Sequence, residues 1–389
     1  MKNDYSQFLQ WLSETRRDFH MHPEISHQEK RTTQRIAEIL KAYDCEVQLF
    51  DDMTGAVGII RGAQEGPTIG LRADIDALPI QELNDIPYKS QNPGAMHACG
   101  HDAHATIMLG VARNIMTSGL QSKLKGNVKF FFQPAEERIA GAKAMIERGV
   151  LENPRVDRVI AGHMAPDLPV GTVGVFRGLG YASADMFELN ITGRGTHGAR
   201  PEEGNDPIVA GAHFVTTIQS IVARNIKPTD AAVVTVGKCA SGDVSNVIPE
   251  TAHLEVSIRA LTAEVRQKLI ERLHEIAAGL GKTFNVDSRF ILHEGVPPLE
   301  NDIEVAEFLY EVSKDVLGEE NVSYRPPAMG SEDFYYFTAE RPSAIMRLGC
   351  CNSEKDLARS LHSPYFDIDE QVLGISVAIF TAAVTRYLS

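Results

Sequence analysis

Apolar residues recur along the N-terminal segment with the spacing of amphipathic helices. This pattern covers about residues 5–43 and is interrupted at Pro23, a residue that breaks a helix interior. Short continuous apolar runs follow at 57–60 and 68–71, and they have the length of buried strands. We therefore predict helices on both sides of Pro23 and then two strands of a sheet.

The alternation of helical and strand patterns continues through the next hundred residues. A helical pattern begins at His101, and an aromatic strand pattern covers 128–132. A helix over 141–148 and a buried strand over 156–161 follow. Strands that alternate with helices are typical of an α/β fold, so we expect a mixed, mostly parallel sheet flanked by helices.

The pattern changes near residues 178–184, where a compact α+β unit of about a hundred residues begins. After about Phe290 the chain returns to helices and apolar strands. We therefore predict one discontinuous domain, 1–181 and 292–389, and an inserted second domain, 182–291. The elements expected in the inserted domain are a strand over 187–191, a helix over 207–223, strands over 232–236 and 252–258, and a helix over 263–279.

Composition agrees with a two-domain globular chain and excludes several classes of partner. The chain has 389 residues, of which 43% are hydrophobic and 23% charged, which is ordinary for folded domains. A net charge of -14 disfavours nucleic acid as a partner, because phosphate contacts need a basic patch. No apolar run approaches the roughly 18 residues of a membrane span, so we expect no membrane association.

Cellular location is inferred from the N-terminus and from the cysteines. The first residues contain neither the apolar stretch nor the cleavage site of a secretory signal. The chain has 5 cysteines, an odd number with scattered spacing, which does not resemble a disulfide framework. The simplest interpretation is a cytoplasmic protein with reduced thiols.

The densest polar cluster of the chain covers residues 97–104. It holds three His, one Cys and one Asp within eight residues, between a turn at 92–94 and a helical pattern. Cys and His are the favoured ligands of zinc and related divalent ions, which indicates a metal site. The alternative interpretation is a polar loop in which Asp102 is the N-cap of the following helix.

Further acidic groups and histidines follow predicted strands. Glu136 and Glu137 come after the aromatic strand, where one carboxylate can bind metal while the other handles a proton. By themselves these acids also fit the start of a helix. His163 comes directly after a buried strand, and sites of open α/β sheets gather at the carboxyl ends of strands. This His could equally be a structural residue.

Two more segments extend the inventory of possible ligands. Arg72, Asp74 and Asp76 also follow a strand, and such charges need partners that a metal site would supply. His362 lies in a short polar segment near the C-terminus. Because one metal needs only three or four ligands, this inventory supports two, and two metals about 3.5–4 Å apart can bind a carbonyl and activate a water together.

In these stretches the chain resembles a known family, the M20 metallopeptidases, and in particular their aminoacylase, hippurate hydrolase and auxin-conjugate hydrolase branch. The stretches occur in family order over almost the whole chain, so together they are highly specific. They are RRDFHMHPE (16–24), LRADIDALP (71–79), MHACGHDAH (96–104), FFQPAEE (131–137), GH ending at His163, DVSNVIPE (243–250), MGSEDF (329–334) and LHSPYF (361–366).

The resemblance implies a ligand set and a separate base. Cys99 is expected to be a thiolate that bridges two metals, where other branches use a carboxylate. Glu136 is expected to be the general base, which takes a proton from water and passes it to the leaving amine. Asp76 is expected to orient one of the metal-bound groups. The other expected ligands are His101, Glu137, His163 and His362.

The resemblance also implies cofactors and a role for the inserted domain. Two divalent ions per subunit are expected, Mn²⁺ or Zn²⁺ first, with Co²⁺ or Ni²⁺ also suited to the ligands. The inserted domain is expected to be a lid that mediates assembly into a homodimer or a higher homo-oligomer. His197 matches a lid residue that stabilises the oxyanion, in some relatives across the dimer. Asn246 and Arg259 resemble residues that hold the substrate, and Arg259 suits a carboxylate.

The chain departs from the family pattern in three loops. Residues 138–141 stand where relatives carry a glycine-rich run, beside the predicted base. Glu202 and Glu203 follow Pro201, where relatives often have His. Residues 164–166, after the predicted ligand His163, are similar to those of N-acetyldiaminopimelate deacetylases. These changes leave the predicted metal site intact and concern the choice of acyl group.

The function predicted from the sequence is metal-dependent hydrolysis of the amide bond of N-acyl amino acids, such as N-acetyl or N-benzoyl compounds. The products are a carboxylic acid and a free amino acid. Alternatives within the family are N-acetyldiaminopimelate deacetylase-like, dipeptidase or carboxypeptidase activity. A non-catalytic metal-binding protein is a further alternative, although a structural site needs no second carboxylate, Glu136, beside a ligand Glu137.

Overall fold

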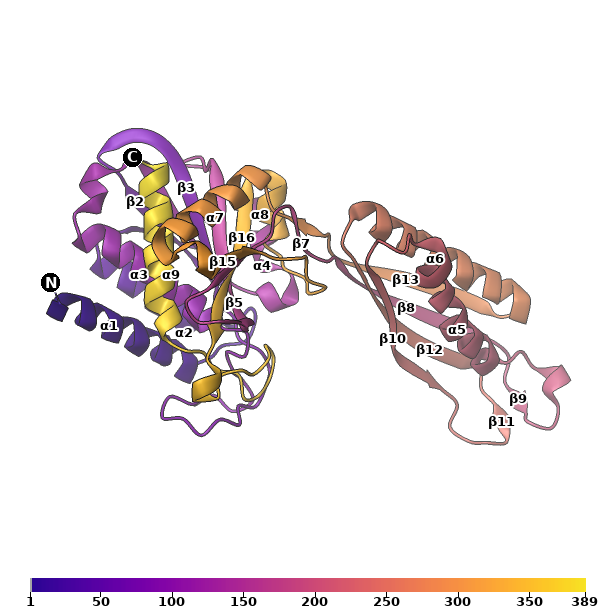
Figure 1. The fold of residues 1–389 in the computed structure, drawn as a ribbon. Helices are drawn as coiled ribbons and strands as arrows, with labels where there is room; N and C mark the ends of the chain where they lie inside the picture. The colour runs from indigo at the N-terminus through magenta and orange to yellow at the C-terminus, as the bar shows by residue number, and fades with distance from the viewer. Residues whose placement is uncertain (1) are drawn as a thin grey trace. The chain divides into compact units, whose positions relative to one another are not determined.

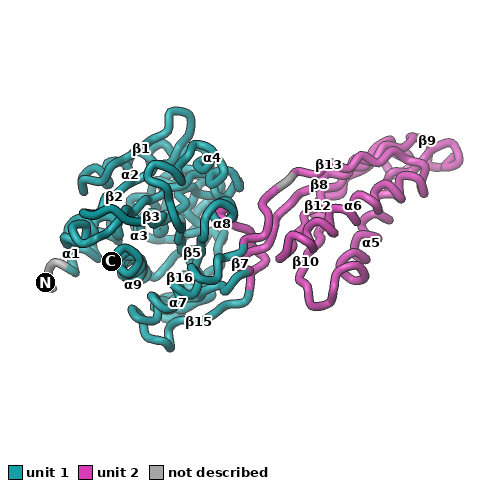
Figure 2. Tube along the Cα trace, turned by 90° about the horizontal axis from the view of Figure 1, so that it is seen from above, with its two compact units in different colours: residues 1–178, 300–326, 336–389 teal, residues 179–299, 327–335 magenta. Residues whose placement is uncertain are grey.

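The computed structural model describes residues 2–389, except for the side chains of residues 2–4 and 294. The chain forms two compact units, and Figure 2 shows which segments belong to each. The first unit comprises residues 1–178, 300–326 and 336–389, and the second comprises 179–299 and 327–335.

Segment 327–335 belongs to the second unit, although the sequence analysis placed it in the first domain. The reason is local hydrogen bonding, because the amide of Ala182 lies 3.1 Å from the Ala328 carbonyl oxygen and 2.8 Å from that of Gly330. The second unit begins at residue 179 and its first segment ends at 299, whereas the sequence analysis expected the inserted domain to begin at 182 and end at 291.

An eight-stranded sheet forms the centre of the first unit, in the order β1-β2-β4-β3-β5-β16-β6-β15 (Figure 1). The neighbours β4, β3, β5 and β16 are parallel, whereas β2 pairs with β1 and with β4 in antiparallel fashion. The expected mixed, mostly parallel sheet is confirmed. The strands are β1 Glu46–Leu49, β2 Ala56–Arg61, β3 Gln64–Asp74, β4 Lys125–Gln133, β5 Arg158–Pro169, β6 Val173–Val175, β15 Val322–Tyr324 and β16 Ser343–Cys351.

Both faces of this sheet are covered, which explains why its central strands are apolar without alternation. On β4, Phe130 and Phe132 belong to the main hydrophobic core together with Leu40 of α2. Phe131 points to the other face, where its ring lies 5.3 Å from that of Phe337 in α8. The helices of this unit are α1 Lys2–Met21, α2 Lys30–Ala42, α3 His101–Thr117, α4 Gly141–Glu147, α7 Ile303–Leu317, α8 Tyr335–Glu340 and α9 Gln371–Tyr387.

Two strands are longer than the sequence pattern indicated. β5 continues to Pro169, so His163 lies inside the strand rather than after it. It continues because β16 keeps pairing with it, with Arg347 opposite His163. β3 likewise contains Arg72 and Asp74, which we had expected in the following loop. In contrast, the helix break at Pro23 is confirmed, because α1 ends at Met21.

The second unit is an antiparallel sheet in the order β10-β12-β8-β13, against which α5 and α6 pack. Its core alternates along the strands, as with Phe187 and Leu189 of β8 and Leu254 of β12. β13 was not foreseen as one strand, because the expected domain limit fell inside it. The elements are β8 Ala184–Thr192, α5 Pro207–Asn225, β10 Ala232–Ser241, β12 Thr251–Ala260, α6 Ala263–Phe284 and β13 Asp287–Val296, with short strands β7 Leu179–Tyr181, β9 Thr196–His197, β11 Val247–Ile248 and β14 Leu299–Glu300.

A membrane-spanning helix was not expected, and across residues 2–389 the model contains no helix that combines the necessary length and apolarity.

Candidate metal centre

Parallel pairing brings three polar chain segments to the same edge of the large sheet. β3 lies between β4 and β5, so the carboxyl ends of these strands are neighbours. Asp76 follows β3, Glu136 and Glu137 follow β4, and His163 lies in β5 just beyond Ala161, the last residue that pairs with β3. This edge is where open α/β sheets place their sites.

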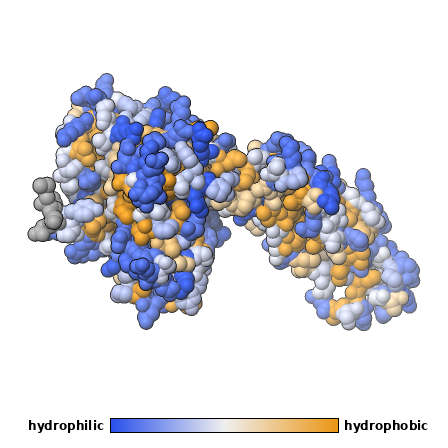
Figure 3. All heavy atoms as spheres, in the orientation of Figure 1, coloured by the Kyte–Doolittle hydropathy of each residue, from blue (hydrophilic) through white to orange (hydrophobic). Residues whose placement is uncertain are grey.

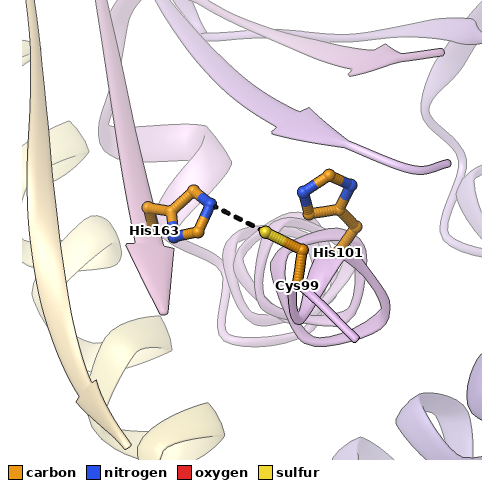
Figure 4. Close-up of side chains that lie close together, drawn as sticks. All are labelled: Cys99, His101 and His163. Carbon is orange, nitrogen blue, oxygen red and sulfur yellow. Dashed lines mark hydrogen bonds between the residues drawn. The ribbon is translucent and has the colours of Figure 1, made fainter. Parts of the chain in front are cut away.

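The predicted ligands meet at this edge in two groups of three that share Cys99. Cys99 joins His101 and His163 in one group and Glu137 and His362 in the other. Within each group the ligand atoms lie within 4.8 Å of one another. Figure 4 shows the first group, in which Cys99 Sγ lies 3.5 Å from His163 Nε2.

The predicted base lies beside these groups. Glu136 forms a further group with His101 and Glu137, again with ligand atoms within 4.8 Å. Glu136 lies in a three-residue 3-10 turn, Glu136–Arg138. The next residue of this turn, Glu137, belongs to the ligand group of Cys99 and His362. The two adjacent glutamates therefore belong to different ligand groups of the same site.

Hydrogen bonds select the ring nitrogen that each buried histidine presents. His101 Nδ1 lies 2.9 Å from the backbone oxygen of Asp76 and 3.2 Å from its Oδ1, and both are acceptors. His163 Nδ1 lies 2.8 Å from the backbone oxygen of Met164. Both Nδ1 atoms must therefore carry the proton and donate, which leaves the Nε2 lone pairs available to a metal ion.

The donor set fits divalent cations. His101 Nε2 is buried and has no hydrogen-bond partner within the described part of the chain, and the buried Glu137 Oε1 lies 3.4 Å from His362 Nε2. A buried polar atom without a partner is costly, and a bound cation removes that cost for an imidazole and a carboxylate alike. Thiolate, imidazole and carboxylate together suit zinc and similar first-row ions.

The charges around the proposed ligands also favour positive charge at the site. Hydrogen bonds to Cys99 and Glu137 raise the pKa of His362 to about 10, against the opposing effect of burial. Burial lowers the pKa of His101, but the charges of Asp74 and Cys99 outweigh burial and hold that pKa well above its usual value. Burial raises the pKa of the Cys99 thiol. A divalent cation would reverse the last effect and favour the thiolate.

Asp76 orients two of the predicted ligands, a point that the sequence left open. Its Oδ1 accepts from His101 Nδ1, and its Oδ2 accepts from the Glu137 amide at 3.1 Å. The Ser26 hydroxyl donates to the same Oδ2 at 2.6 Å. Ser26 had not been identified from the sequence, because it lies fifty residues away in a loop with no metal-ligand signal.

A second buried network supports the strand that carries His163. Arg72 Nη1 donates to Asp74 Oδ2 at 2.7 Å, and Asp74 Oδ1 accepts from His104 Nδ1 at 2.5 Å. His104 Nε2 then accepts the Met164 amide at 2.8 Å. The backbone next to His163 is thereby fixed from both sides. Asp74 and His104 lie in two of the quoted motifs, but no sequence pattern predicts that they pair.

Asp102 is not the helix N-cap of the alternative interpretation. The N-cap of α3 is Gly100, with φ 88°, and Asp102 lies in the first turn. Its carboxylate accepts from Arg16 Nε at 2.7 Å and lies 2.8 Å from His20 Nδ1, and all three side chains are buried. These contacts anchor the first turn of α3, which also carries His101.

The second unit holds the predicted lid residues on exposed segments. β9 pairs with β11, which sets His197 opposite Val247, and the Gly198 amide donates to the Asn246 carbonyl at 2.8 Å. The Ala199 amide donates to His197 Nδ1 at 3.0 Å. A neutral His197 therefore carries its proton on Nε2, where it can donate to a ligand.

Arg259 comes from β12 and is half-buried. Its Nη1 donates to the Ser331 hydroxyl at 2.9 Å, and burial lowers the pKa of the guanidinium. Since an arginine keeps its charge at neutral pH, the remaining donors suit a carboxylate. Ser331 lies in the noted MGSEDF stretch but had been given no role.

Comparison with known proteins shows which family and which relatives this chain is similar to. The model of peptidase family M20/M25/M40 matches residues 70–386. The chain is 37% identical to an N-acetylcysteine deacetylase of Bacillus subtilis, over 95% of this chain and 94% of that protein. It is 34% identical to a hippurate hydrolase of Campylobacter jejuni, over 96% and 95% of the two chains. A dinuclear metal-binding M20 peptidase from Bacillus subtilis superposes with a TM-score of 0.84 at 32% identity, over 98% and 99%.

Proposed function

Because the chain belongs to peptidase family M20/M25/M40 and is an amidohydrolase of that family, we propose that it hydrolyses N-acyl amino acids to a carboxylic acid and a free amino acid. The relatives named above include a deacetylase of an N-acetyl amino acid and a hippurate hydrolase, which supports a small N-acylated substrate. The proposal leaves the acyl group to experiment.

One observation carries this proposal, namely the two ligand groups that share Cys99 with Glu136 beside them. A single structural ion would need only one such group and no adjacent base. We propose that Cys99, His101, Glu137, His163 and His362 hold two divalent ions. Such ions would lower the pKa of a water molecule and polarise the scissile carbonyl.

The side chains of the protein would carry the remaining steps. Glu136 takes the proton of the attacking water and delivers it to the leaving amine. His197 donates a hydrogen bond from its Nε2–H to the oxyanion that develops on the carbonyl. Arg259, together with Asn246, binds the carboxylate of the amino acid. Asp76 keeps His101 and Glu137 in place while the charge distribution changes.

We also propose that the second unit mediates assembly into a homodimer or a higher oligomer. Hydrophobic side chains reach the surface of this unit, as Figure 3 shows, and Met186, Val244 and Val247 are among the most exposed. In its sheet, β10 and β13 are edge strands with unpaired backbone groups. Light scattering after size-exclusion chromatography tests this, and a monomer at micromolar concentration would refute it.

The catalytic proposal is tested by activity after metal reconstitution with Zn²⁺, Mn²⁺, Co²⁺ or Ni²⁺. The panel holds N-acetyl and N-benzoyl amino acids, N-acetyldiaminopimelate, dipeptides and C-terminally amidated controls. We expect hydrolysis of N-acyl amino acids and little activity on amidated controls, since these lack the carboxylate for Arg259. Faster hydrolysis of dipeptides would contradict the substrate class, and an inert metal-loaded protein would contradict catalysis.

Glu136→Gln is the matched test of the base. It keeps the size of the side chain but cannot accept a proton from water, so kcat should fall about 10²–10⁴-fold. Metal content, measured by elemental analysis, should stay that of the wild type. Normal turnover in this variant would remove Glu136 from the mechanism.

A further inference from the structure

The turn that carries the proposed base has an unusual backbone conformation. Glu136 and Glu137 lie between Ala135, with φ 52° and ψ 40°, and Ile139, with φ 55° and ψ 41°. Both flanking residues are therefore left-handed, and for the β-branched Ile139 this conformation is a genuine outlier. Strain of this kind is unfavourable and persists only where surrounding contacts enforce it.

A buried carboxylate from a distant segment holds the start of this turn. Glu29 Oε1 accepts the Ala135 amide at 2.9 Å, and its Oε2 accepts the Thr54 hydroxyl at 2.6 Å. On the other side, the Ala135 carbonyl accepts the amides of Ala140 and Gly141 at 3.2 and 3.3 Å. The polar groups on both sides of Ala135 are thus fixed, one of them by a side chain 106 residues away.

Helix capping does not explain the position of Glu29. It immediately precedes α2, yet its side chain makes no capping hydrogen bond. Glu24 satisfies the first amides of the helix instead, because it accepts from Arg31 at 3.0 Å and from Thr32 at 2.8 Å. Glu29 is 0% exposed, and burial of a carboxylate is unfavourable unless its hydrogen bonds compensate.

We propose that Glu29 is a positioning residue that holds the Ala135 peptide in its left-handed conformation and thereby sets the direction of the Glu136 carboxylate. The inference rests on the proposed role of Glu136 as the base. In the described part of the chain, the hydrogen bonds of the Glu29 side chain go to Thr54 and to the Ala135 amide and not to the proposed ligands, so it acts through the backbone of the turn. A misplacement of a reacting group by about 1 Å is enough to cost about 10²-fold in rate.

The test compares three variants of the metal-loaded full chain. Glu29→Ala should lower kcat by about 10–100-fold, with KM and metal content close to wild type. Glu29→Gln should recover most of kcat, because its amide oxygen accepts from Ala135 while its amide nitrogen donates to Thr54. Glu24→Ala is the matched control, since it removes a partly buried helix-capping carboxylate nearby; it should lower Tm and leave kcat unchanged.

Two results would overturn the inference. One is a Glu29→Ala protein with reduced Tm but wild-type kcat, because Glu29 would then be structural only. The other is a Glu29→Gln protein as impaired in kcat as Glu29→Ala, since geometry could not be the cause. If Glu29→Ala does not fold, Thr54→Val replaces it, because loss of one partner of Glu29 should still lower kcat severalfold at unchanged KM; an unchanged kcat there counts against the inference.

Glu136→Gln, assayed in parallel, separates this inference from the proposed function. If Glu136→Gln is inactive and Glu29→Ala is fully active, the positioning role fails while the base assignment stands. If Glu136→Gln is fully active, the assignment of Glu136 as the base is wrong, and the positioning role of Glu29 falls with it.

Discussion

Most functional side chains of the first unit are buried, with the exposed His362 as the exception, whereas those of the second unit lie mainly at its surface. In the first unit, Cys99, His101 and His163 are at most 9% exposed, and hydrogen bonds to a backbone or carboxylate oxygen fix both imidazoles. In the second unit, His197 and Asn246 lie on exposed segments. A single amide fixes the His197 ring, from a residue two positions along the chain.

This difference indicates how the work is divided. A ligand set must be preorganised, because metal affinity depends on the geometry and protonation of every donor. A residue that acts on the substrate can stay exposed until the substrate arrives and lid closure excludes water. We therefore expect changes at the proposed ligands and at the groups that orient them to alter metal binding, and changes at His197 to alter turnover alone.

The sharpest contrast comes from two cysteines. Cys99→Ala removes the atom shared by both ligand groups, so bound metal and turnover should both fall to background. Cys239→Ala is the matched control, because Cys239 is an exposed thiol on β10 of the second unit. Elemental analysis and kcat measure the outcome. Full metal content in Cys99→Ala would contradict the shared-ligand assignment.

The next effect concerns His197, the proposed oxyanion donor. His197→Ala should lower kcat by about 10²–10³-fold, the usual cost of one lost oxyanion donor. Metal content and Tm should not change, because the side chain is exposed and packs into no core. Loss of metal in His197→Ala would contradict the view that the second unit affects turnover and not metal binding. Turnover within twofold of wild type would remove His197 from the mechanism.

A smaller effect is expected from a buried carboxylate that binds no metal itself. Asp76→Asn replaces one acceptor oxygen by a donor that faces other donors, so metal affinity should fall about 10–100-fold. Asp185→Asn is the control, because Asp185 is equally buried in the second unit and pairs with Arg266. Competition titration with a chelator measures both. Equal metal affinities in the two variants would show that Asp76 has no special role.

The smallest effect is a pH dependence of stability in the first unit. Burial raises the pKa of Asp367, but Arg16 and the Tyr88 hydroxyl outweigh burial and hold it below its usual value. A carboxyl group whose pKa is lower in the folded than in the unfolded protein stabilises the fold at pH values above its unfolded pKa of about 3.9. This stabilisation is lost as the pH falls toward the pKa of the folded protein. Stability of this unit should therefore decline below about pH 4.

Fluorescence can follow this decline selectively, because Trp11 is the single tryptophan and lies in the first unit. Asp367→Asn should be less stable at neutral pH and show a shallower loss of stability between pH 4 and 2. An unchanged slope in that variant would mean that the Arg16–Asp367 pair is not the source of the acid sensitivity.

Sequence alone predicted most elements and the ligand candidates. Periodicity located the helices around Pro23 and the inserted α+β segment, because one buried face leaves a regular spacing of apolar residues. The ligand types were visible because thiol, imidazole and carboxylate groups concentrate in short stretches. The resemblance to M20 enzymes assigned them roles, and the model brings the same residues together at one sheet edge.

Tertiary structure alone decided which groups support the site. Ser26, Glu29 and His104 act on residues that lie 50, 106 and 60 positions away, and no local pattern encodes such pairs. The extension of β5 through His163 likewise depends on its neighbour β16. The physical reason is the same in each case. The sequence shows the chemical type of each side chain. Its hydrogen-bond partner, however, depends on how strands and helices that are remote along the chain pack together.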